Sequence, residues 1–127
     1  MSAVTTHVLD TALGRPAVGV PVRLERILPT RPGGVTGDPA GPPVEVLVEV
    51  LAEAATDADG RVAGLGPDQV EPGTYRLVFA TAAYSAATGQ ACFFPEVAVT
   101  FTLTDPTHHH HVPLLLSPFA YSTYRGS

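Results

Sequence analysis

The sequence predicts an all-β domain in which short strands form a sandwich of two sheets. Thirteen Pro and twelve Gly divide the 127 residues into short segments, which suits strands joined by turns better than long helices. Several segments alternate apolar and polar residues with period two, the pattern of a strand with one buried face. Seven or eight short strands and at most one helix are typical of a β-sandwich. The length fits one domain, residues 1–127.

The first part of the chain contains two predicted strands and a long loop. Thr5–Asp10 is a short β-prone run, and residues 11–16 form a turn after it. Val18–Ile27 alternates, and Pro21 within it marks either an edge strand or the beginning of a strand, because proline cannot donate to a sheet. Pro29–Pro43 contains five Pro and four Gly. We expect a surface loop there, without strand or helix.

The middle of the chain contains two strands, a turn and one short helix. The apolar positions of Val44–Ala55 suit either a helix or a strand, and the valines favour a strand. Asp59-Gly60 follows, a pair that is typical of a hairpin turn. Gly73–Phe79 alternates and is predicted to be a strand. Ala80–Gly89 is rich in alanine and ends in glycine, so it is predicted to be a short helix with Gly89 as its cap.

Three strands complete the predicted sandwich. Glu96–Thr104 alternates apolar and polar residues along its whole length. Asp105-Pro106-Thr107 turns the chain into His108–Leu116, and Ser117-Pro118 separates that strand from Phe119–Arg125. No internal repeat of fixed period interrupts this series of strands.

Composition excludes several classes of function. A formal net charge of −5 argues against non-specific binding to nucleic acid. The single cysteine, Cys92, excludes an intrachain disulfide and a zinc thiolate cluster. No stretch reaches the roughly 18 apolar residues that span a bilayer, and the N-terminus lacks the pattern of a signal peptide. We therefore expect no membrane partner and a cytoplasmic location.

Four consecutive histidines, His108 to His111, stand at the beginning of a predicted strand. Strand alternation sends His109 and His111 to one face and His108 and His110 to the other, so one pair can converge on a site. An affinity tag is disfavoured because the run is internal. A metal-binding tract is an alternative, although no Cys, Asp or Glu lies beside the run to complete a defined site.

Three other positions draw attention by residue type. His7 lies in an otherwise apolar and threonine-rich strand, where the ordinary alternative is a structural histidine. Arg61 follows a turn, where the alternative is a solvated side chain or a surface ion pair. The tail Ser122–Ser127 is β-prone to its last residue, although termini commonly fray. Composition and spacing alone do not assign catalysis to any of them.

The chain resembles the 5-hydroxyisourate hydrolases, the transthyretin-related proteins. The resemblance rests on THVLDTALGRPAVGVPVRLER, TDADGRV, GTYRLVFATAAY and FFPEVAVTF, and on the C-terminal HHVPLLLSPFAYSTYRGS. It covers about residues 4–127 apart from the loop at 29–43, which looks like an insertion. It implies a transthyretin-like β-sandwich of two four-stranded sheets with one short helix. The tail Tyr-Arg-Gly-Ser distinguishes these hydrolases from the hormone-carrying transthyretins.

The resemblance also implies a set of site residues. The catalytic set would be His7, Arg61, His111 and Ser127. The same four residues would contact substrate together with Tyr124, Arg125 and Gly126. The family usually has His-Tyr-His where this chain has residues 109–111, so His110 takes the place of the tyrosine and is expected to point away from the site.

The implied reaction is the hydrolysis of 5-hydroxyisourate to 2-oxo-4-hydroxy-4-carboxy-5-ureidoimidazoline in urate degradation, without a metal or other cofactor. The implied assembly is a homotetramer, a dimer of dimers, with sites in the channel between dimers. Two alternatives stay open at this point. One is a transthyretin-like protein that binds a small ligand without catalysis, because fold alone does not decide function. The other is a metal-buffering protein that uses the histidine run.

Overall fold

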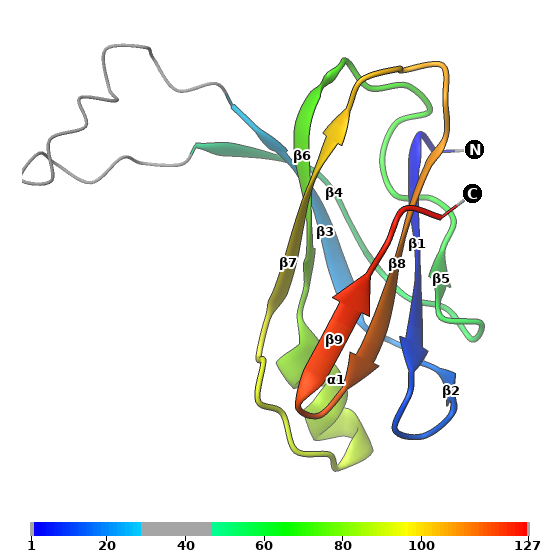
Figure 1. The fold of residues 1–127 in the computed structure, drawn as a ribbon, viewed down its shortest axis with the longest axis vertical. Helices are drawn as coiled ribbons and strands as arrows, with labels where there is room; N and C mark the ends of the chain where they lie inside the picture. Colours follow the sequence, from blue (N-terminus) through cyan, green and yellow to red (C-terminus); the bar gives the residue numbers. More distant parts are fainter. Residues whose placement is uncertain (1, 29–46, 127) are drawn as a thin grey trace, which may run out of the picture.

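The computed structural model of the protein describes residues 2–28 and 47–126, and it is a sandwich of two facing β-sheets (Figure 1). The predicted all-β sandwich is therefore confirmed. The predicted loop at 29–43 lies outside the described residues. The two ends of the described chain lie side by side at one end of the sandwich, with the helix at the other. The backbone amide of His110 donates to the carbonyl of Ala3 there, at 2.9 Å.

The first sheet has five strands rather than the predicted four. Its order is β2-β1-β8-β9, and β5 pairs separately with β1. The extra strand arises because the turn after β1 folds the chain back, so that Pro16 pairs with Leu9 and Arg15 with Asp10. The bounds are β1 Val4–Asp10, β2 Arg15–Pro16, β5 Arg61–Val62, β8 His110–Ser117 and β9 Ala120–Thr123.

The second sheet has four antiparallel strands in the order β4-β3-β6-β7. Pro21 is the first residue of β3, so of the two predicted reasons for a proline here the beginning of a strand is correct. Val18 was predicted to belong to this strand but is 54% exposed, because Gly19 has a φ of 78° and breaks the extended chain. The bounds are β3 Pro21–Ile27, β4 Val48–Ala55, β6 Gly73–Phe79 and β7 Val97–Leu103.

The predicted helix is confirmed as α1, Thr81–Thr88. Gly89 ends it with a φ of 66° and donates its amide to the carbonyl of Ala86, the left-handed cap for which glycine is suited. In the part of the chain that the structure describes, no helix is both long and apolar enough to cross a membrane.

The predicted hairpin at Asp59-Gly60 is wrong, although a turn is present. The strand before it, β4, lies in the second sheet, and the strand after it, β5, pairs with β1 in the first sheet. The turn therefore carries the chain from one layer of the sandwich to the other. A two-residue signal reports the local bend but does not say with which strand the following residues pair.

Strand β1, near the beginning of the sequence, lies in the middle of the first sheet and pairs there with β8, near the end of the sequence. It runs parallel to β8, with Val4 opposite His110 and Asp10 opposite Leu116. Its side chains alternate between buried and half-buried positions along all seven residues. Val4 and Val8 enter the core between the sheets, so Thr5 and His7 face outward on the other side.

A buried hydrogen-bond cluster fixes the far end of β1 to the helix. The hydroxyl of Tyr84 donates to Oδ2 of Asp10 at 2.6 Å, and the Gln90 side-chain amide donates to the same oxygen at 2.9 Å. Burial raises the pKa of Asp10, but these bonds and the Leu13 amide outweigh it and lower the pKa. Burial and the bond to Asp10 raise the pKa of Tyr84 to about 12.

We expect Tyr84→Phe to lower the free energy of unfolding by about 1–3 kcal/mol, because it leaves a buried carboxylate with one donor fewer. Urea unfolding followed by circular dichroism measures the loss. Tyr121→Phe is the matched control, since Tyr121 is 41% exposed and should change stability by no more than about 0.5 kcal/mol. Equal losses in the two variants would contradict a specific role for the Tyr84 hydroxyl.

Candidate functional site

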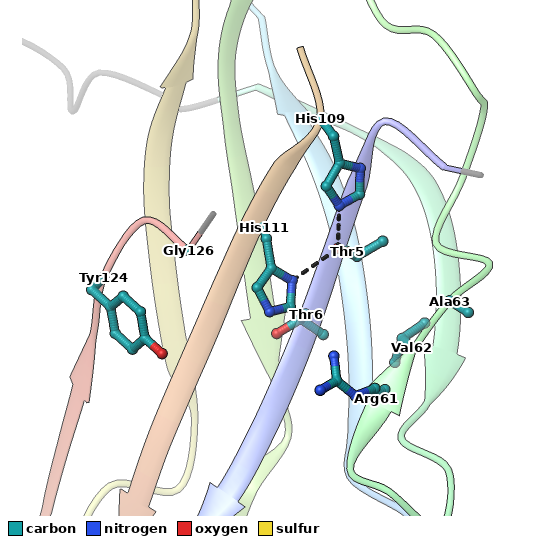
Figure 2. Close-up of a pocket in the computed structure, with 9 residues that line it drawn as sticks. All are labelled: Thr5, Thr6, Arg61, Val62, Ala63, His109, His111, Tyr124 and Gly126. Atoms are coloured by element: carbon teal, nitrogen blue, oxygen red, sulfur yellow. Dashed lines mark hydrogen bonds between the residues drawn. The ribbon is translucent and has the colours of Figure 1, made fainter.

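A cavity of about 530 Å³ opens on the outer face of the first sheet (Figure 2). Its residues come from the beginning of the chain, from the segment after the turn at 57–60, from β8 with the segment before it, and from the C-terminal tail. They carry hydroxyl, imidazole, guanidinium and phenol groups, together with two small apolar side chains. The lining residues are Thr5, Thr6, Arg61, Val62, Ala63, His109, His111, Tyr124 and Gly126.

The strand register explains why distant residues meet at this cavity. Thr5 lies opposite His111 in the parallel pair of β1 and β8. His7 lies opposite Arg61 in the antiparallel pair of β1 and β5. Gly126 forms an isolated bridge with His111. The segment with Arg61 and the C-terminal tail, which are far apart in sequence, therefore both lie against a short stretch of β1 and β8.

The histidine run divides between two faces as the alternation predicted. His109 and His111 line the cavity, with ring centroids 6.4 Å apart and an interplanar angle of 18°. His110 is 4% exposed and borders a second cavity of about 240 Å³ together with residues of β7. His108 is exposed, with Nδ1 3.6 Å from a carboxylate oxygen of Asp105. The prediction that His110 points away from the site is therefore consistent with the structure.

The surroundings of His111 favour its neutral form. Burial lowers the pKa of the imidazole, and the positive charge of Arg61 and the histidines His109 and His7 lower it further. A hydrogen bond with the backbone of Thr5 acts in the opposite direction and is outweighed. A neutral imidazole can accept a proton from water near pH 7.

A tight turn positions Arg61. Oδ1 of Asp57 accepts hydrogen bonds from the backbone amides of Asp59 at 2.9 Å and Arg61 at 3.0 Å. Gly60, with a φ of 76°, adopts a conformation that favours glycine. The guanidinium lies at the edge of the cavity opposite His111 (Figure 2), where it can bind two oxygens of a planar ligand.

His7 is close to the cavity but does not line it. Its Nε2 lies 2.9 Å from the carbonyl oxygen of Asp59, and a carbonyl only accepts, so this nitrogen carries a proton. His7 lies on the same face of β1 as Thr5, and its charge contributes to lowering the pKa of His111. The predicted direct role of His7 stays a prediction.

The tail residues separate into three positions. Tyr124 and Gly126 line the main cavity, and the amide of Gly126 donates to the carbonyl of His111 at 2.8 Å. Arg125 borders the second cavity instead. Ser127 lies outside the described residues. Up to Gly126, the tail is therefore held against β8 and does not fray.

Three polar residues of the cavity, Thr5, Thr6 and His109, were not in the predicted catalytic or substrate-binding sets. Thr5 bonds through its hydroxyl to both cavity histidines, and His109 had been recognised only as one of the pair that shares a face. The sequence contained a signal for Thr5, because it lies two positions before His7 and therefore shares the outward face of β1 with it. Within residues 2–28 and 47–126, no group of three or more His, Cys, Asp or Glu could hold a metal ion.

The protein is thus a β-sandwich with a cavity of histidine, arginine and hydroxyl groups on the face of one sheet, a candidate site for a small molecule. The chain belongs to the HIUase/Transthyretin family, whose profile matches residues 4–126. It is similar to a 5-hydroxyisourate hydrolase of Mus musculus, with 46% identity covering 99% of this chain and 96% of the relative. A 5-hydroxyisourate hydrolase of Caulobacter vibrioides is 41% identical and both chains are covered completely.

Solved structures show the same fold. The 5-hydroxyisourate hydrolase of Klebsiella pneumoniae superimposes with a TM-score of 0.75 at 34% identity, covering 100% of both chains. Sea bream transthyretin in complex with thyroxine gives a TM-score of 0.79 at 27% identity, covering 98% of this chain and 94% of its own. The fold is therefore shared by proteins described as a hydrolase and as a hormone complex.

Proposed function

We propose that this chain hydrolyses 5-hydroxyisourate to 2-oxo-4-hydroxy-4-carboxy-5-ureidoimidazoline in urate degradation. The observation that carries the proposal is the single cavity that contains Arg61, His111, Tyr124 and Gly126. These residues come from the motifs that distinguish the hydrolases from the transthyretins. Relatives bearing this activity in their names match this chain at 38–46% identity over nearly its whole length.

The chemistry of cyclic-amide hydrolysis needs three things that the site can supply. Water must lose a proton as it attacks a ring carbonyl, and neutral His111 is suited to accept it. The carbonyl oxygen develops negative charge, which the guanidinium of Arg61 can stabilise. The departing ring nitrogen needs a proton, which the imidazolium formed at His111 or a proton on His7 can return. Tyr124 and the tail would then border the bound ring.

The main rival is a transthyretin-like protein that binds a small ligand without catalysis. The shared fold does not separate the two. The site does, because a carrier needs no proton acceptor beside an arginine, and the cavity contains both. The Tyr-Arg-Gly-Ser tail, held against β8 at Gly126, supports the hydrolase in the same way.

The decisive experiment generates 5-hydroxyisourate with urate oxidase and follows its decay by ultraviolet absorbance, with and without the protein. We expect a decay rate that rises in proportion to protein concentration and is unchanged by a chelator. Decay at the spontaneous rate would overturn the proposal and favour the carrier. Loss of activity with chelator, restored by added metal, would favour a metal-dependent role for the histidine run.

We expect kcat/KM to stay high on the acidic side of neutrality. A base works only when deprotonated, and the pKa of His111 lies below its ordinary value of 6.5. The acid limb of kcat/KM should therefore have its midpoint below 6.5, and activity should fall as the pH decreases through that midpoint. Initial rates over about pH 5–8, corrected for spontaneous decay, measure it. A midpoint above 6.5 would contradict a neutral His111 as the base.

We also propose that the protein is a homotetramer, a dimer of dimers, located in the cytoplasm. Strand β9 ends its sheet and all four of its residues are exposed. Tyr121 within it is 41% exposed, and Phe119 just before it is 69% exposed. An edge of this kind can continue a sheet across a two-fold axis. Analytical ultracentrifugation at micromolar concentration tests the assembly, and a monomer would contradict it.

A further inference from the structure

The hydroxyl of Thr5 lies between two histidine rings of the cavity. Its Oγ1 is 2.7 Å from Nε2 of His109 and 2.9 Å from Nδ1 of His111 (Figure 2). At the far side of His109, Nδ1 is 3.1 Å from the carbonyl oxygen of Ser2. Four groups thus form one continuous chain of hydrogen bonds that ends at His111.

The direction of every bond in this chain follows from its first member. The carbonyl of Ser2 can only accept, so Nδ1 of His109 must carry a proton. In a neutral imidazole the other nitrogen is then bare, and Nε2 of His109 accepts from Thr5. The hydroxyl of Thr5 has a single proton, which this bond uses. Its oxygen must therefore accept from His111, and Nδ1 of His111 carries a proton.

We propose that Thr5 and His109 are positioning residues that hold neutral His111 in the tautomer with its proton on Nδ1 and with Nε2 free to accept a proton in the cavity. The effect of this tautomer on catalysis rests on the proposed function, but the tautomer itself can be measured in the protein without substrate. The Thr5 hydroxyl bonds to Nδ1 of His111, so Nε2 is left as the basic atom of the site.

The placement of Thr5 argues for this role rather than for a purely structural one. Its backbone is already paired with His111 in the sheet, so the strand does not need the side-chain bonds. Its neighbour Thr6 shows the structural alternative, because it faces inward and donates to the carbonyl of Val112 at 2.6 Å. A hydroxyl that orients a histidine ring fixes both the tautomer and the ring plane.

The test compares Thr5→Val, which keeps the shape and removes the hydroxyl, with Thr5→Ser, which keeps the hydroxyl. Nitrogen-15 NMR of the histidine rings at neutral pH reports the tautomer directly. We expect pyrrole-like Nδ1 and pyridine-like Nε2 for His111 in the original protein and in Thr5→Ser. In Thr5→Val we expect His111 to lose this preference, and kcat to fall about tenfold with little change in KM, a typical loss for an orienting partner.

Thr74→Val on β6 is the matched control, because it makes the same chemical change in the second sheet and should leave kcat and the His111 spectrum unchanged. An Nε2-protonated His111 in the original protein would overturn the inference, whatever the activity. An unchanged tautomer and kcat in Thr5→Val would overturn it as well. Failure of the original protein to hydrolyse 5-hydroxyisourate, with the expected tautomer present, would instead count against the proposed function alone.

Discussion

Replacing His111 with asparagine is expected to lower kcat for 5-hydroxyisourate by about 100-fold to 10,000-fold, the range for loss of a general base. Asparagine keeps a polar side chain that can bond to Thr5 but cannot take a proton near neutral pH. The side chain of His111 is half-buried on the outer face of the sheet, so the core between the sheets is unaffected. Stopped-flow absorbance measures the rate, and circular dichroism checks the fold.

A His7→Asn variant measured in parallel separates the two histidines. His7 was predicted to share the proton transfer, and its Nε2 bonds to the carbonyl of Asp59 outside the cavity lining. A loss as large as that of His111→Asn would support a direct role for His7. Turnover of His111→Asn within a few fold of the original, with the fold intact, would remove His111 from the mechanism.

Gly126→Ala is expected to reduce kcat by about 100-fold, the effect that a misplacement of about 1 Å can have on a reacting group. A methyl group at this position would lie 2.5 Å from Cδ2 of His111 and 3.3 Å from Cγ of Pro113. Cδ2 is bonded to Nε2, the basic atom, while Nδ1 on the other side is held by Thr5. Either the ring or the tail must move, and each movement disturbs the cavity.

Gly64→Ala is the control for this variant. An added methyl group there meets nothing within 4 Å, and Gly64 adjoins Ala63 at the edge of the same cavity. We expect near-original activity and thermal stability for Gly64→Ala. If Gly126→Ala also keeps full activity, then the close approach of the tail to His111 does not position the ring.

Much of the fold could be predicted because the alternation of buried residues is a local signal. Gly73–Phe79 was predicted residue for residue, and Gly89 identified the end of α1. Apart from strand ends such as Val18, the errors concern pairing, which is not local. The Asp59-Gly60 turn joins different sheets instead of a hairpin, and β2 adds a fifth strand because a turn happens to fold back on β1.

The site could be predicted only in part from the residues themselves. Alternation separated His109 and His111 from His110, and the resemblance supplied Arg61 and the tail. The role of Thr5 depends on the parallel register of β1 with β8, which joins residues about a hundred positions apart. No pattern in either segment states which residue of one strand will lie opposite which residue of the other.

The alternation of β1 also has a consequence for protein engineering and for evolution. Its even-numbered residues contribute to the packed interior and its odd-numbered ones face the cavity side. The same seven residues therefore specify both the packing of the core and the chemistry of the outer face. Inserting or deleting one residue would exchange them, placing Val4 and Thr6 outside and Thr5 and His7 in the apolar layer. Substitutions at odd positions can retune the chemistry while the scaffold stays constant, but a change in length by one residue destroys both together.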